Sequence, residues 1–71
     1  MPFFVAADPR RLAPGQVRVW ATAFPSRAAA TAHAQALSEP CVVIEARTLR
    51  AAVENARAMQ RTASRQASPL A

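Results

Sequence analysis

The chain has 71 residues, and its nine cationic residues are all arginine, against four acidic ones, for a formal net charge of +5. A chain of this length forms one domain that buries only roughly 60% of its unfolded surface, so it offers no roomy cofactor cavity. One glycine cannot build a glycine-rich phosphate loop, and one cysteine cannot form an intramolecular disulfide. We therefore expect a cytoplasmic protein without a cofactor, without a bound metal and without a membrane segment.

The first predicted element is a strand over Phe3–Ala7, and residues 8–16 follow it as a loop. Within this loop, Pro14 and Gly15 fit the two central positions of a type II turn. Such a turn needs a positive φ at its second central residue, which the glycine supplies. The turn reverses the chain before the next element.

A second strand is predicted over Val17–Phe24. Its alternation places Val17 and Val19 on one face, while Arg18, Trp20 and Phe24 share the other. Aromatic side chains beside a charge indicate an edge or a partly covered surface. We therefore expect Trp20 and Phe24 on a face that the helices leave open, where they would contact a partner.

Two capped helices flank a third predicted strand. Ser26 is a good N-cap for an alanine-rich helix over 27–38, which ends before Pro40. The strand over Cys41–Ala46 lacks alternation, as expected for a strand that is covered on both faces or sits centrally. Thr48 caps the last helix, which we expect to fray after Arg61, leaving a domain of residues 1–62 and a flexible tail of residues 63–71.

This order, ββαβα, predicts an α+β two-layer sandwich with a three-stranded mixed sheet and two helices on one face. Because strand–helix–strand crossovers are almost always right-handed and join parallel strands, we expect 17–24 and 41–46 to run parallel. Such a sheet has unpaired edge strands, which a second copy of the chain could pair with, so a monomer and a homodimer are both compatible with the sequence.

The last helix carries a stripe of charge opposite its apolar side. On a helical wheel, Arg50, Glu54, Arg57 and Arg61 share one sector, and Arg47 precedes the helix. We expect Leu49, Val53, Ala56 and Met59 to pack on the other side. The spacing also predicts that Glu54 pairs with Arg50 or Arg57.

Three interpretations fit this stripe. It is a solvated helix face, a phosphate-binding face, or a surface for an acidic patch on another protein. We expect no aromatic residue near the stripe to stack a base, so any nucleic-acid binding there should be electrostatic and insensitive to base sequence.

Catalytic groups are scarce. Cys41 is the only candidate nucleophile and His33 the only candidate base for it, and His33 falls in the apolar sector of its helix, where a half-buried structural histidine is the expected role. Neither residue has the additional ligands that a metal site needs. The sequence therefore predicts that the protein is not an enzyme.

Ala23-Phe24-Pro25-Ser26-Arg27 followed by alanines, within roughly residues 17–46, resembles one half of a SPOR repeat, a peptidoglycan-binding module. The resemblance implies a strand–helix–strand unit. The second half of the repeat is not recognisable, so we base no functional prediction on it.

We instead predict a small binding protein that covers a surface of a larger macromolecule, with a protein partner that bears an acidic patch. By analogy of size, phage or mobile-element inhibitors of host machinery, such as anti-CRISPR proteins, belong to this class. The alternatives are a weakly specific nucleic-acid-binding protein that uses the arginine-rich helix face, and a housekeeping oligomer subunit. The predicted partner-binding residues comprise Arg47, Arg50, Glu54, Arg57, Arg61, Trp20 and Phe24.

Overall fold

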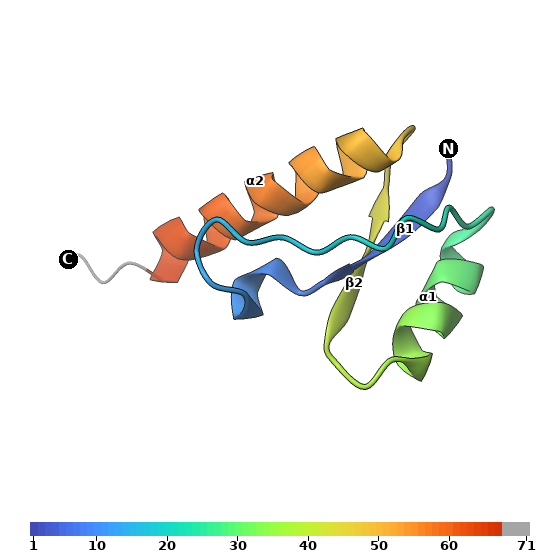
Figure 1. Cartoon of the computed structure of the whole chain (residues 1–71), viewed down its shortest axis with the longest axis horizontal. Helices are drawn as coiled ribbons and strands as arrows, with labels where there is room; N and C mark the ends of the chain where they lie inside the picture. The colour runs from blue at the N-terminus through green and yellow to red at the C-terminus, as the bar shows by residue number, and fades with distance from the viewer. Residues whose placement is uncertain (68–71) are drawn as a thin grey trace.

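The computed structural model describes residues 1–67, with side chains through residue 63, and has an α+β fold of two antiparallel strands and two helices. Residues 68–71 of the predicted tail lie outside the described residues. The elements, in chain order, are β1 (Phe3–Ala7), the 3₁₀ helix η1 (Pro9–Arg11), α1 (Arg27–Ala36), β2 (Cys41–Glu45) and α2 (Leu49–Ala67) (Figure 1).

The sheet is built around β1, whose bounds match the strand predicted at residues 3–7. β1 pairs with β2 in an antiparallel register that places Phe4 opposite Ile44 and Val5 opposite Val43. Every residue from Phe4 to Ala7 is buried, whereas only Ile44 is buried in β2. β1 lies between β2 and the segment at 17–24, so the prediction that 41–46 is central or covered on both faces was wrong.

The predicted strand over 17–24 is not a continuous strand. It runs along the other edge of β1 and forms two isolated antiparallel bridges, Ala6 with Val19 and Phe3 with Phe24. Between these bridges, β1 advances by three residues and the segment by five, so two extra residues interrupt the pairing. The predicted third strand is therefore not formed. The segment 17–24 does run parallel to β2, as expected, but both pair antiparallel with β1, so the prediction of a mixed sheet was wrong.

The layered packing of helices against strands is present, but the helices cover different faces of the strand pair (Figure 1). Alternate strand residues point to opposite faces. On one face, Phe4 and Ile44 share a core cluster with Ala52 of α2. On the other face, the guanidinium carbon of Arg27 in α1 lies 5.1 Å from the centroid of the Phe3 ring. The prediction that both helices lie on one face was wrong.

Both helix starts follow the predicted capping. The Ser26 hydroxyl accepts a hydrogen bond from the Ala29 N–H at 3.1 Å, and the Thr48 hydroxyl accepts one from the Ala51 N–H at 3.1 Å. Such caps satisfy backbone donors that the first turn leaves free. α2 continues to Ala67, beyond the point where the sequence predicted fraying.

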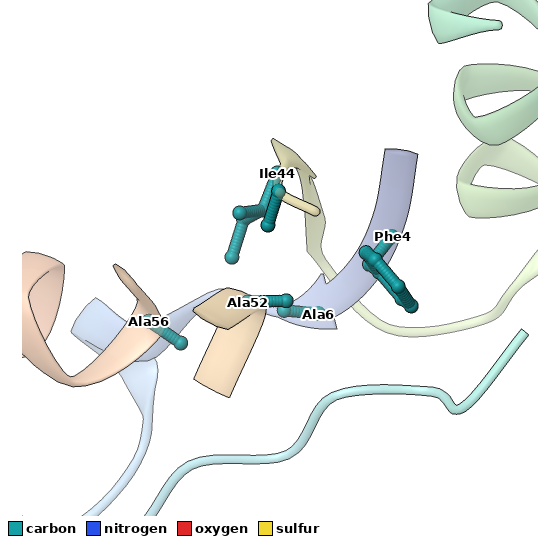
Figure 2. Close-up of a cluster of buried hydrophobic side chains, with 6 residues drawn as sticks. Phe4, Ala6, Ile44, Ala52 and Ala56 are labelled. Atoms are coloured by element: carbon teal, nitrogen blue, oxygen red, sulfur yellow. The ribbon is translucent and has the colours of Figure 1, made fainter. Parts of the chain in front are cut away.

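The buried face of α2 is made of small residues. Ala52 and Ala56 are fully buried and pack against the strands in the core cluster of Figure 2, whereas Leu49 is 37% exposed and Met59 is 42% exposed. Because alanine lets backbones approach closely, the helix lies near β1 and β2, and the longer apolar side chains remain at its flank. The prediction was right for Ala56 and wrong for Leu49 and Met59, because the buried side of α2 is rotated toward Ala52.

Gln60 continues this buried face and holds the loop after β1. Its Nε2 donates to the carbonyl oxygens of Pro9, Ala13 and Gln16 at 3.3, 3.0 and 2.8 Å, and its Oε1 accepts from the Gly15 N–H at 3.0 Å. The turn itself matches the prediction, because Gly15 has a φ of 84°. One buried side chain thus fixes the whole connection between η1 and the segment at 17–24.

Candidate binding surface

The arginine face of α2 is defined here as Arg50, Glu54, Arg57 and Arg61, and all four residues are exposed. Arg47, just before the helix, is also exposed. Within residues 1–63, the side-chain ion pairs are Arg10 with Asp8 and Arg18 with Glu39. The predicted pairing of Glu54 with a neighbouring arginine is not among them, so these guanidinium groups are available to an external anion.

A groove of about 430 Å³ lies beside this face, between α2 and the segment that follows the Gly15 turn. We call it the edge groove; it is lined by Val17, Arg18, Val19, Trp20, Val53 and Arg57. It brings together Trp20 and Arg57, which the sequence had placed on separate predicted surfaces. The expectation that no aromatic residue lies near the arginine stripe was therefore wrong.

Arg18 belongs to this groove, although it was not among the predicted site residues. Its guanidinium lies 5.1 Å from the centroid of the Trp20 ring and donates to Glu39 Oε2 at 3.2 Å. The cation–π contact and the ion pair hold the long side chain in one place. The alternation of residues 17–24 already put Arg18 and Trp20 on one face, so the sequence did contain the signal for this residue.

Phe24 has a structural role instead of the predicted open position. It exchanges two backbone hydrogen bonds with Phe3, at 2.9 and 2.8 Å, and its ring lies 5.2 Å from the ring of His33 in α1. It therefore lies against a helix-covered face. His33 is half-buried beside it, as expected for a histidine at a contact between a helix and the sheet.

The Gln60 contacts position the edge groove. The turn at Gly15 leads directly into Val17, and β1 then holds this stretch through Ala7 N–H to Arg18 O and Trp20 N–H to Val5 O, both at 2.9 Å. Sequence reasoning did not identify Gln60. Its spacing of four residues from Ala56, itself four from Ala52, was the available signal that it shares the buried face.

A second groove, of about 450 Å³, lies between η1 and the later part of α2. Asp8 and Arg10 contribute its charged groups, and the rest of its lining is mainly apolar, with Pro9, Val42 and Met59 among it. Hydrogen bonds from Arg10 hold the pKa of Asp8 below its ordinary value. The carboxylate thus caps η1 and pairs with the Arg10 guanidinium.

The remaining reactive group, Cys41, sits at the start of β2. Its thiol donates to the carbonyl oxygen of Glu39 at 3.4 Å, and burial, followed by the nearby charge of Glu39, raises its pKa. A raised pKa keeps the thiol protonated, which makes it a poor nucleophile. Among the described residues, no three His, Cys, Asp or Glu side chains cluster in a way that would hold a metal ion.

The part of the chain that the structure describes contains no helix with the length and apolar character needed to cross a bilayer. In comparisons with known proteins, the chain matches no family model, no curated protein and no solved structure.

Proposed function

We propose that this chain is a small non-catalytic binding protein that covers an acidic surface of a larger protein. The observation that carries the proposal is the junction of the edge groove with the arginine face at Arg57. At this junction the surface is formed by Trp20, by apolar side chains and by Arg57. Arg57 has no ion-pair partner among residues 1–63. Tryptophan and arginine are the side chains that most often dominate protein interfaces.

The arrangement supports binding more than it supports stability. Exposed arginines contribute little to folding, since their charges are solvated and screened. A positive field of this kind accelerates encounter with an acidic partner. An inhibitor that a phage or mobile element directs at host machinery is one kind of protein that would work in this way.

Affinity capture with matched variants tests the proposal. Arg57→Glu reverses a charge in the groove, and Arg11→Glu makes the same change at an exposed residue of η1. With nuclease-treated lysate of the source organism, we expect acidic proteins to be retained by the wild type and by Arg11→Glu, and to be lost with Arg57→Glu. Equal retention by all three baits would contradict the proposal.

A second candidate function is supported by Trp20. Trp20 lies beside Arg18 and Arg57 in the edge groove. Proteins that bind single-stranded nucleic acid use aromatic residues to stack on bases and cationic residues to contact phosphates. Salt separates the two candidates. Phosphate binding weakens linearly in log K against log salt, with a slope near the number of phosphate contacts, whereas a protein interface with an apolar centre responds less steeply.

A further inference from the structure

The outer edge of the segment 17–20 carries free backbone groups. In an antiparallel pair, successive residues direct their N–H and C=O groups alternately toward and away from the partner strand. Arg18 O and Trp20 N bond to β1, so the N–H and C=O of Val19 point away from it. We expect the same direction for Val17, two residues earlier on this segment. Within the described residues, these backbone groups have no hydrogen-bond partner, and Val17 and Val19 are among the residues that line the edge groove.

We propose that this edge binds an extended acidic segment of the partner protein as an added strand. The inference rests on the proposed function and specifies how its partner is held. Strand addition derives affinity from main-chain hydrogen bonds and specificity from alternate side chains. Here Val17, Val19 and Val53 provide an apolar floor, and Arg57 provides a cation for an acidic side chain.

The backbone pattern favours a polypeptide over nucleic acid. The edge presents both donors and acceptors, and another strand presents the complementary set. A phosphate backbone offers acceptors only, so it would leave the carbonyl oxygens of Val17 and Val19 without donors.

Charge favours a heterologous acidic strand over a second copy of this chain. Two edges of this chain placed together would bring Arg18 and Arg57 near the same residues of the other copy, and like charges across strands are destabilising. The formal net charge of +5 opposes self-association further. An acidic strand meets the opposite sign, and Arg50 and Arg61 on the same helix extend the complementary charge.

The test is an NMR titration of the ¹⁵N-labelled full chain with a defined peptide. The probe is a soluble peptide of about six residues that alternates Glu and Val, the usual length of a strand. There are two control peptides. The first has Lys in place of Glu, and the second is the Glu peptide N-methylated on alternate residues, so that one edge of the peptide has no N–H groups to donate. We expect the Glu peptide to slow hydrogen exchange at the Val17 and Val19 amides and both control peptides to fail.

Two variants test the same contact from the side of the protein. Arg57→Glu is expected to weaken the peptide about tenfold or more, because it places like charges together, and Arg11→Glu is expected to leave affinity unchanged. Val19→Pro removes an outward N–H without removing a bond to β1. If Val19→Pro fails to fold by circular dichroism, the N-methylated peptide still tests the edge, because it removes the complementary hydrogen bonds from peptide N–H groups to the outward carbonyl oxygens.

The unfavourable outcomes are distinct. Peptide binding that shifts α2 resonances but leaves Val17 and Val19 unprotected overturns strand addition and leaves the proposed function standing. The inference is also overturned if the peptide protects the β2 amides instead of these two, or if single-stranded DNA protects Val17 and Val19 equally well. It is overturned as well if the protection coincides with dimerisation of this chain, which light scattering detects. An absence of peptide binding overturns it as well, while the lysate capture judges the proposed function separately.

Discussion

The side chain of Gln60 and the backbone of Gly15, 45 positions apart in sequence, are joined by a 3.0 Å hydrogen bond. The same amide donates to three carbonyl oxygens of the surrounding loop. The last helix therefore fixes the path of the chain from η1 to the edge groove. This contact links the stability of the fold to the position of the proposed binding surface.

Replacement of Gln60 is expected to destabilise the protein. Gln60→Ala leaves partly buried carbonyl groups without a donor, and we expect a loss of about 2 kcal/mol in the free energy of unfolding. Gln60→Glu keeps the acceptor for Gly15 but removes the donors, so it is expected to be at least as damaging. Urea denaturation measures both, with Gln35→Ala, an exposed residue of α1, as the control. A Gln60→Glu variant as stable as the wild type would show that the carbonyl contacts contribute nothing.

Asp8 is expected to make stability depend on acid pH. The Arg10 side chain and backbone N–H donate to its carboxylate at 3.0 to 3.1 Å, which lowers the pKa of Asp8 from its ordinary 3.8. Since the folded pKa lies below the unfolded one, the stabilisation is present above about pH 3.8 and is lost as the pH falls through the folded pKa.

The measurement is the free energy of unfolding against pH for the wild type and Asp8→Asn. The difference between them should be constant near neutral pH and should shrink below about pH 4. Glu54→Gln, at an exposed residue, is the control. A difference that does not change with acid pH would contradict the role assigned to the Asp8 carboxylate.

The Cys41 thiol is expected to react slowly with alkylating reagents. Burial and the charge of Glu39 raise its pKa above the ordinary 9.0, so little thiolate is present at neutral pH. Alkylation by iodoacetamide should be slower than that of a free cysteine at the same pH and should reach the free rate in denaturant. Fast alkylation of the folded protein at neutral pH would reopen a nucleophilic role for this residue.

Reversal of charge on the arginine face is expected to leave the fold intact. Arg57 and Arg61 are exposed and form no ion pair among the described residues, so the double change to Glu should alter the free energy of unfolding by less than about 1 kcal/mol. Thermal melting followed by circular dichroism measures this. A large fall in the midpoint would mean that these residues support folding and would undermine their use as binding probes.

Two truncations locate the end of the domain. A chain that ends at Thr62 keeps Gln60, and we expect it to melt cooperatively near the wild-type temperature. A chain that ends at Met59 lacks Gln60 and should lose about as much stability as Gln60→Ala. Circular dichroism compares the two, and a Thr62 chain without a cooperative transition would place the domain boundary later than the sequence predicts.

The sequence alone determined the features that depend on near neighbours. The strand at 3–7, the turn at Gly15 and the caps Ser26 and Thr48 were all predicted where they occur. Each depends on backbone preferences or on hydrogen bonds over a few residues, which local sequence encodes directly. The exposure of the arginine face also followed from helical periodicity.

The tertiary structure decided which surfaces meet. The pairing of residues 17–24 with β1 is broken because two extra residues lie between Val19 and Phe24, and no local pattern shows the register of a distant strand. The rotation of α2 was likewise misjudged. Ala56 is buried as predicted, but Leu49 and Met59 are exposed, and the helix packs through Ala52 and Gln60 instead. All hydrogen-bond partners of the Gln60 side chain lie in a loop more than 40 residues away in sequence. The edge groove, and with it the meeting of Trp20 and Arg57, exists only because of that packing, since both of its walls come from elements that no short-range rule connects.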